Sequence, residues 1–391
     1  MNKRLKILWL PAWLPSKVDF LNGDFVQRHA IAVSKFADVV VLFVVKDESL
    51  ILANTLIELQ EKEGLSVYTG YYNSSIKNIF LKKIKLIYIY FYLLFKLYYT
   101  AKKRHGIFNL VHVHISSKQG LFALWLKFVK GINYVITEHS GWFMPIGKDI
   151  FTRNIFTKII IKINYKYASA IHVVSQNLGI QLQKKYQFIK SVKVIPNVVD
   201  NSIFFYKQEM NKELPTNFLA INGNNFQKNI DGIIRSFSTY LKNGNDAFLH
   251  IAGPNDEALK ILVKELDLND SVKFYGTVAN EIIASLMQKT DAFVFFTRFE
   301  SFGCVMAEAL CCGKPIIASN LDVLRENLEE NINALFVESE NEKDLTDKLI
   351  YFTNNKSKFD NNKIAEDAKA KFNFDKVGKD FLTFYNSVLE K

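Results

Sequence analysis

The sequence predicts an α/β protein of two domains, each built on a parallel, doubly wound sheet. Short apolar runs of strand length alternate with stretches of helical length along most of the chain. A second series of this kind begins after a polar stretch near residue 200. The length of 391 residues is also more than one hydrophobic core usually holds, which favours two domains over one.

The first series of apolar runs predicts the strands of the first sheet. A helix from about 25 to 36 is expected after the first strand. These runs are 5–10, 39–45, 110–114, 134–137, 170–174 and 192–195. The run 39–45 has no polar residue, which is typical of a strand buried on both faces. Parallel sheets bind ligands beyond the carboxyl ends of their strands. We therefore expect 11–24, 112–118, 138–142 and Ser175 at one edge.

The second series predicts the second sheet and a final helix. Its apolar runs are 218–222, 248–252, 272–274, 292–296 and 316–319, and the polar residues 201–216 before them are predicted to form a linker. Near the end of the sequence, Val377, Phe381, Phe384 and Val388 recur at helical spacing. We therefore expect domains at 1–199 and 200–375, followed by a helix at 376–391.

Positive charge is concentrated in the first half of the chain. The net charge is +11, and residues 1–200 contain 28 Lys and Arg against 11 Asp and Glu. Such a basic region favours anionic partners, but no nucleic-acid-binding module accompanies it. Lysines flank the aromatic run LIYIYFYLLF (86–95), which favours an anionic membrane surface as the partner. The alternative is a partly buried helix whose lysines reach solvent.

The three cysteines, Cys304, Cys311 and Cys312, lie within one short segment. Adjacent cysteines make a poor disulfide framework, so we expect reduced thiols and a cytoplasmic protein. The basic amino terminus is followed by a short apolar run that proline interrupts, which predicts a first strand rather than a signal peptide. No stretch reaches the roughly 18 uncharged apolar residues of a membrane-spanning helix.

The segment 297–319, TRFESFGCVMAEALCCGKPIIAS, carries the strongest functional signal. It follows the apolar run 292–296 and predicts a loop, a helix and a buried strand. We expect Ser301 to cap the helix and Gly313 to end it. The free N–H groups and positive dipole end of the helix favour a phosphate there. Two carboxylates, Glu300 and Glu308, frame the helix with seven residues between them.

This segment resembles the E-x7-E motif of the retaining GT-B glycosyltransferases of family 4, also called glycosyltransferase group 1. The match includes Ser301, Phe302 and Gly303, and IPNVVD (195–200) resembles the I-P-N-G-V-D linker of the family. The resemblance implies the GT-B fold, in which two Rossmann-like domains face a central cleft and the last helix crosses back to the first domain. It also implies that Glu300 binds the hydroxyls of the donor sugar and Glu308 those of the ribose. The helix start at 301–303 is expected at the donor phosphates.

Five further positions are similar to functional residues of the family or suit the same role. Gly23 resembles the glycine of its amino-terminal loop, and His139, in ITEHSGW, resembles the histidine beside the donor sugar. Ser175 resembles a serine after its strand, with helix capping as the rival role. Lys228 resembles the lysine that binds the donor diphosphate, and Arg298 is a further candidate for a phosphate. We thus expect His139 and Glu300 to be catalytic, and Gly23, Ser175, Lys228, Arg298, Ser301, Phe302, Gly303 and Glu308 to bind the donor.

The resemblance implies transfer of a sugar, with retention, from a UDP- or GDP-sugar to a hydroxyl of a glycan or lipid-linked acceptor. Bacterial surface polysaccharide, lipopolysaccharide or glycolipid synthesis is the expected setting, at the inner face of the cytoplasmic membrane. No cofactor is expected, and because no Asp-x-Asp motif occurs, no metal is expected either. We expect His112 and His114, in VHVH, to lie on opposite faces of their strand and therefore not to chelate a metal together.

Two departures from the family pattern keep other functions open. The family has an arginine where this chain has Asn222 or Gly223, and a Gly-Gly turn where it has Asp322 and Val323. One alternative is a noncatalytic nucleotide-sugar-binding subunit of a glycosyltransferase complex. The other is a nucleotide-sugar epimerase of the same fold, which converts the donor without an acceptor.

Overall fold

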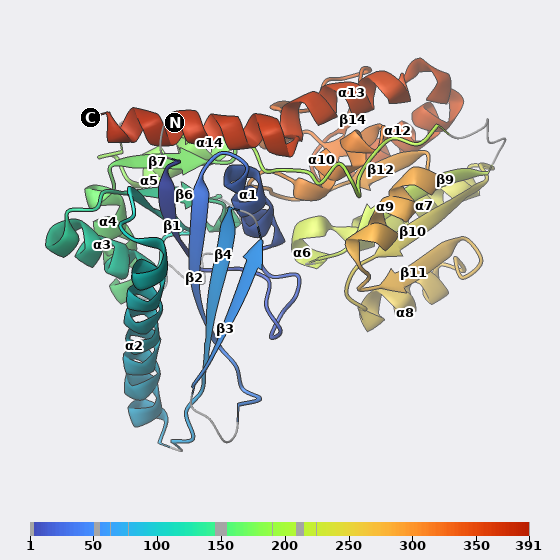
Figure 1. Cartoon of the computed structure of the whole chain (residues 1–391). Coiled ribbons are helices and arrows are strands. Elements are labelled where there is room, and N and C mark those ends of the chain that lie inside the picture. The colour runs from blue at the N-terminus through green and yellow to red at the C-terminus, as the bar shows by residue number, and fades with distance from the viewer. Residues whose placement is uncertain are drawn as a thin grey trace.

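The chain forms two α/β domains side by side, joined by a long helix along one side (Figure 1). The computed structural model describes residues 4–50, 55–62, 64–76, 78–144, 155–189, 191–208, 215–223 and 225–390. Part of the predicted linker, 209–214, lies outside these residues. The predicted fold class, two doubly wound parallel sheets, is confirmed.

The amino-terminal sheet has the strand order β3-β4-β2-β1-β5-β6-β7-β8, and every pair in it is parallel except β3 with β4. Its strands are β1 Lys6–Pro11, β2 Asp38–Lys46, β3 Thr55–Lys62, β4 Leu65–Tyr72, β5 Leu110–His114, β6 Tyr134–Glu138, β7 Ala170–Val173 and β8 Lys193–Val194. The central strands β1, β5 and β6 are almost entirely buried, as their apolar sequences require.

Helices cover both faces of this sheet. They are α1 Asp24–Ser34, α2 Ile79–His105, α3 Gln119–Lys130, α4 Ile155–Tyr167 and α5 Gln176–Lys185, with a 3-10 turn η1 at Gly141–Phe143. The start of α2 is fixed by Asn78, whose side chain accepts hydrogen bonds from the backbone N–H groups of Phe80 and Leu81. Among the described helices, none combines the length and the apolar character that a bilayer span requires.

The carboxyl-terminal sheet has the order β11-β10-β9-β12-β13-β14 and is parallel throughout its pairs. Its strands are β9 Thr216–Ile221, β10 Ala247–Ala252, β11 Val272–Gly276, β12 Ala292–Phe295, β13 Ile316–Ser319 and β14 Ala334–Val337. Its helices are α6 Asn225–Lys228, α7 Ile230–Lys242, α8 Glu257–Glu265, α9 Asn280–Lys289, α10 Cys304–Cys311, α11 Asp322–Arg325, α12 Glu342–Asn354 and α13 Asn361–Phe372, with a 3-10 turn η3 at Lys356–Lys358.

The last helix, α14 (Phe374–Leu389), leaves the carboxyl-terminal domain and packs on α1 of the other domain (Figure 1). Its buried residues Val377, Phe381 and Tyr385 join one apolar cluster with Trp9 of β1. The Tyr385 hydroxyl lies 2.6 Å from Nδ1 of His112. The core of the amino-terminal domain is therefore completed by residues from the far end of the sequence.

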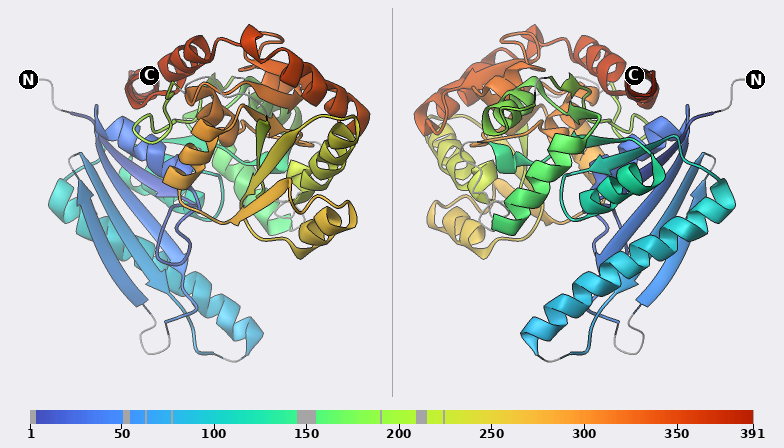
Figure 2. Two further views of the ribbon diagram at one scale, coloured as in Figure 1. Left: turned by 90° about the vertical axis from the view of Figure 1, so that its right-hand side faces the viewer. Right: turned by 90° about the vertical axis from the view of Figure 1, so that its left-hand side faces the viewer.

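The hairpin of β3 and β4 was not foreseen from the sequence. β3 is an edge strand whose residues TLIELQEK are mostly exposed, so it contains no apolar run of the kind that marks the other strands. The hairpin and α2 extend together away from the rest of the molecule (Figure 2). The first turns of α2 expose apolar side chains, among them Ile79, Phe80 and Tyr88.

Candidate active site

The loop between β12 and α10 is built around a glycine with a left-handed backbone. Gly303 has φ 89° and ψ 66° and occupies the N-cap position of α10, so the helix starts at Cys304. The prediction that Ser301 caps this helix is therefore wrong, because the chain makes its turn two residues later. Gly313, with φ 72°, follows the end of the helix as expected.

Glu300 is buried in this loop and is held by two side chains of its own domain. Its Oε1 atom accepts hydrogen bonds from Nζ of Lys228 at 2.5 Å and from Oγ1 of Thr297 at 3.2 Å. Lys228 is the last residue of α6, and the left-handed residue Asn229 (φ 52°) starts α7 directly after it. The sequence-predicted lysine and the first motif glutamate thus form a partly buried ion pair.

This ion pair lines a cavity of about 190 Å³ between the two domains. The carboxyl-terminal wall, as we call it, consists of Lys228, Glu300, Ser301, Phe302, Gly303, Cys304 and Val305. The amino-terminal wall consists of Phe25, His139 and Asn197. Six of the predicted site residues therefore line one space, although they come from both halves of the sequence: His139, Lys228, Glu300, Ser301, Phe302 and Gly303.

Glu308 does not line this cavity but pairs across the domains with Arg28 of α1. Nη1 of Arg28 donates to Oε1 of Glu308 at 2.7 Å, and the side chain also binds Asp24, with Nε 2.8 Å from Oδ2. Burial by itself lowers the pKa of Arg28, but the carboxylates of Glu308 and Asp24 raise it above its ordinary value. Burial raises the pKa of Glu308, and Arg28 offsets part of that rise. Arg28 therefore stays charged and holds one oxygen of the second motif glutamate.

The other three predicted residues lie around the cavity. Gly23, with φ 79°, precedes α1, and a Cβ there would meet the backbone of Trp13 at 2.5 Å. Ser175 caps α5 by accepting from the N–H of Leu178 and donates to the carbonyl of Ser301 at 2.7 Å. Arg298 donates to Glu340 and to the carbonyl of Phe226, and it lines a neighbouring cavity of about 210 Å³ that also includes Glu300.

A group of buried histidines lies behind the amino-terminal wall. The rings of His112 and His114 lie with their centroids 4.0 Å apart, so the two residues are on the same face of β5. The prediction of opposite faces is wrong, because side chains two residues apart in a strand point the same way. Burial is the first cause of the lowered pKa of both, and of His29, His139 and His172, so these rings are neutral at neutral pH.

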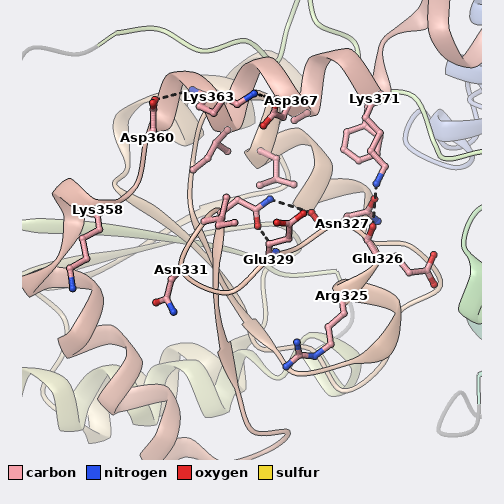
Figure 3. A pocket seen from close by; sticks show the side chains of 16 residues that line it. Arg325, Glu326, Asn327, Glu329, Asn331, Lys358, Asp360, Lys363, Asp367 and Lys371 are labelled. Carbon is pink, nitrogen blue, oxygen red and sulfur yellow. Dashed lines mark hydrogen bonds and ion pairs between the residues drawn. The ribbon is translucent and has the colours of Figure 1, made fainter.

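A larger cavity of about 400 Å³ lies between α13 and the segment 325–333, inside the carboxyl-terminal domain (Figure 3). It contains none of the predicted site residues. Acidic and basic side chains alternate around it, and Lys363 pairs with Asp367 at 2.6 Å. The Glu326 carboxylate at its edge accepts hydrogen bonds from the N–H groups of Gln176 and Asn177 at the start of α5. Size alone therefore does not identify the functional site.

Sequence reasoning missed Arg28 and assigned Asn197 only to a turn. Nδ2 of Asn197 lies 3.2 Å from Sγ of Cys304, so it joins the walls, and burial raises the pKa of that thiol to about 12. The sequence does contain a sign that Arg28 is buried and paired. Arg28 lies four residues after Asp24 on a helix whose neighbouring residues Val26 and Ala30 are apolar. A basic residue in such a place needs a buried partner.

Two family models match consecutive parts of the chain. Residues 57–202 match the model described as Glycosyltransferase Family 4, and residues 203–371 match the model described as Glycosyl transferases group 1. The boundary between the models falls in the segment that joins the two sheets.

Curated relatives and solved structures agree with these models. N-acetyl-alpha-D-glucosaminyl L-malate synthase of Bacillus anthracis is 24% identical over 72% of this chain and 75% of its own length. The O-antigen chain mannosyltransferase RfbU of Salmonella typhimurium is 28% identical over 54% of this chain and 58% of its own length. Anabaena HepE, solved in complex with UDP and glucose, has the same fold, with a TM-score of 0.71 at 16% identity over 98% of this chain and 100% of its own. The chain therefore belongs to the family 4, or group 1, glycosyltransferases and has their GT-B fold.

Proposed function

We propose that the protein transfers a sugar, with retention at the anomeric carbon, from a UDP- or GDP-sugar to a hydroxyl of a glycan or lipid-linked acceptor. The observation that carries this proposal is the partly buried pair of Glu300 and Lys228 in a cavity shared with His139. A cation, a hydroxyl-binding carboxylate and a neutral imidazole on facing walls suit a ligand that has both phosphate and sugar groups.

In this proposal the carboxyl-terminal wall holds the donor. Lys228 donates to the diphosphate, and the N–H groups at the start of α10 face the same charge. Lys228 and this helix end, rather than a divalent cation, then offset the charge of the departing nucleotide. Glu300 accepts hydrogen bonds from the sugar hydroxyls. Glu308 accepts from the ribose through Oε2, while Arg28 holds Oε1.

The reaction itself exchanges one bond to the anomeric carbon for another on the same face. The acceptor oxygen bonds to that carbon as its bond to the donor phosphate breaks, and the acceptor proton passes to the departing phosphate oxygen. His139 is neutral, because burial lowers its pKa well below the usual value, so it can accept or donate a hydrogen bond at the sugar. Neither glutamate acts as a nucleophile in this scheme.

Titration calorimetry with UDP and GDP tests the donor site. Lys228→Ala and Glu308→Ala should each weaken the binding of the matching nucleotide, Lys228→Ala by roughly 10- to 100-fold if it removes a charged hydrogen bond. The matched control is Lys242→Ala, which changes an exposed lysine at the end of α7. Unchanged nucleotide affinity in both site variants would overturn the assignment.

We infer that the acceptor is a membrane-linked glycan and that the protein acts on the cytoplasmic side in the synthesis of a surface polysaccharide, since one relative is an O-antigen mannosyltransferase. The projecting start of α2 supports this, because exposed Ile79, Phe80, Ile84, Ile87 and Tyr88 accompany Lys82, Lys83 and Lys85. Sedimentation with anionic vesicles at low salt tests it. Lys82→Glu, Lys83→Glu and Lys85→Glu combined should abolish binding, and zwitterionic vesicles are the control. A wild-type chain that stays in the supernatant with anionic vesicles contradicts the inference.

A noncatalytic nucleotide-sugar-binding subunit is the second candidate, because Asn222 or Gly223 stands where the family has an arginine. Neither residue offers the donor a charge, and Nδ2 of Asn222 already donates to the carbonyl of Pro254 at 3.1 Å. The purified chain alone, given nucleotide sugars and lipid-linked acceptors, should release free nucleotide and a glycosylated product by mass spectrometry if it is the transferase. Conversion of the sugar without any acceptor, seen by NMR, would instead indicate an epimerase.

A further inference from the structure

Three buried histidines meet at the carboxyl edge of the amino-terminal sheet. His29 comes from α1, His114 ends β5 and His139 directly follows β6. His29 and His114 are fully buried and His139 is 5% exposed. One ring nitrogen from each residue lies within 4.8 Å of the other two. This arrangement brings together three side chains that are 25 to 110 residues apart in the sequence.

The spacing of these nitrogens is close to that of metal ligands. Nδ1 of His114 and Nε2 of His139 lie 3.4 Å apart. In a tetrahedral site with metal–nitrogen bonds of about 2.0–2.1 Å, two ligand nitrogens are about 3.3 Å apart.

The hydrogen bonds around the rings leave lone pairs without donors. Nε2 of His29 lies 3.1 Å from the carbonyl oxygen of Pro196, which only accepts, so Nε2 carries the hydrogen and Nδ1 has a lone pair. A backbone carbonyl that orients the second nitrogen in this way is usual for histidines that bind metals. Within the described part of the chain, Nδ1 of His29 is buried without a hydrogen-bond partner. Nε2 of His114 and Nδ1 of His139, the nitrogens opposite to the pair that lies 3.4 Å apart, are also buried without one. Such unsatisfied atoms need a ligand, an ion or a water.

The donor set determines which cation fits. Three neutral imidazoles suit Zn²⁺ and similar transition metals, whereas Mg²⁺ and Ca²⁺ prefer oxygen ligands. His139 also lines the cavity between the domains, which provides an entry route and space for a water as fourth ligand.

We propose that His29, His114 and His139 form a binding site for Zn²⁺ or a similar transition-metal cation. The cation lies in the amino-terminal wall, joins α1 to β5 and β6, and fixes the orientation of His139. It is separate from the donor diphosphate, whose charge Lys228 offsets in the proposed reaction. Metal binding can therefore be measured without the transferase reaction.

Metal binding by the full chain tests this proposal directly. The protein is treated with a chelator, dialysed and titrated with Zn²⁺ and, separately, Mg²⁺ by calorimetry. One Zn²⁺ per chain should bind saturably, and Mg²⁺ should not. His29→Gln and His139→Gln should each weaken Zn²⁺ binding by at least about tenfold. His250→Gln, which changes a histidine of β10 in the other domain, should bind as the wild type does.

A second measurement needs no variant. In wild-type protein labelled with ¹⁵N in histidine, Zn²⁺ should shift the ring nitrogens of three histidines, and Co²⁺ should produce the strong visible absorption of a tetrahedral site. The proposal is overturned if the wild-type chain binds no Zn²⁺ saturably, which would leave buried water as the partner of these nitrogens. Equal Zn²⁺ affinity in the wild type and both histidine variants would overturn it as well.

Discussion

The two walls of the cleft satisfy their buried polar groups in different ways. In the carboxyl-terminal wall, Glu300 finds Lys228 and Thr297 within its own domain. Behind the amino-terminal wall, the histidines are neutral. The second carboxylate that pairs with Arg28, that of Glu308, belongs to the opposite domain. The carboxyl-terminal wall is therefore electrostatically complete by itself, whereas α1 depends on α10. Charge pairing couples the domains at the helix that carries the family motif.

The largest expected effect comes from breaking this pair. Arg28→Ala should lower the free energy of unfolding by about 3–5 kcal/mol, because it leaves Glu308 charged, buried and unpaired. Urea unfolding at neutral pH measures the loss. Adding Glu308→Gln to Arg28→Ala should recover part of it, since the uncompensated charge is then gone.

Arg235 provides a matched control for Arg28. It also pairs with an aspartate four residues earlier, Asp231, and with a glutamate far along the chain, Glu342. Its side chain is 40% exposed, compared with 10% for Arg28. Arg235→Ala should therefore lower the stability by about 1 kcal/mol or less. Equal losses in the two variants would contradict the coupling of the domains through a buried charge.

Acid should act mainly on the histidines of the amino-terminal domain. Burial lowers the pKa of His29 from 6.5 to about 4, so the folded protein keeps it neutral while the unfolded chain takes up a proton. The contribution of His29 to the free energy of unfolding is therefore fully present above pH 6.5 and is lost as the pH falls towards 4. At about 1.4 kcal/mol per pKa unit, His29 alone contributes roughly 3 kcal/mol at neutral pH.

Urea unfolding at several pH values, for the wild type and for His29→Gln, isolates this contribution. The variant should lose less stability than the wild type between neutral pH and about pH 4. The raised pKa of Glu308 acts in the opposite direction in both proteins, so it does not enter the difference. Parallel pH profiles would show that His29 does not titrate as expected.

Two left-handed glycines, one in each domain, should differ in their tolerance of alanine. Gly23 and Gly303 have φ values of 79° and 89°, so alanine costs about 1–2 kcal/mol at either from the backbone alone. A Cβ at Gly23 would also meet backbone atoms of Trp13 at 2.5 Å, whereas at Gly303 the nearest atom is in the Phe295 ring at 3.0 Å. Thermal unfolding should show a larger loss for Gly23→Ala. The reverse order would mean that the Trp13 segment moves easily.

The smallest effect concerns a contact between the domains. Ser175→Ala removes the N-cap of α5, worth about 1 kcal/mol, together with the hydrogen bond to the Ser301 carbonyl. Asp256→Ala removes a comparable cap, that of α8, where the carboxylate accepts from the N–H of Ala258 within the same helix. Urea unfolding of both variants measures the difference, which we expect to be a further loss of about 1 kcal/mol for Ser175→Ala. A smaller loss than in Asp256→Ala would argue against the contact.

The fold was predictable where the sequence pattern is local. Continuously apolar runs identified the strands that are buried on both faces, and the predicted strand 110–114 agrees with β5 in both bounds. The exposed edge strand β3 has no such run and was not foreseen. The buried strand β14 was not foreseen either, although it is as long as the predicted strands β12 and β13. The start of α10 was misplaced because serine is a frequent cap, while the left-handed turn at Gly303 depends on packing against Phe295.

The site was only partly predictable for a similar reason. Glu300, Lys228 and His139 were identified by resemblance, and the structure brings them around one cavity. The contact of Arg28 with Glu308 joins residues 280 apart, so no pattern within a helix reveals it. The shared face of His112 and His114, in contrast, follows from the alternation of a strand and could have been predicted. The role of Glu308 at the ribose stays a prediction.

The crossing of α14 back onto α1 has a consequence for how the protein is made. Trp9 and Val26 are synthesised long before Phe381 and Tyr385, which belong to the same apolar cluster. The first domain therefore cannot close its core before α14 has been made, even though its sheet is already complete. Until then, the imidazole of His112 lacks its phenol partner. A nascent chain should depend on shielding of this apolar surface by chaperones until α14 has been synthesised.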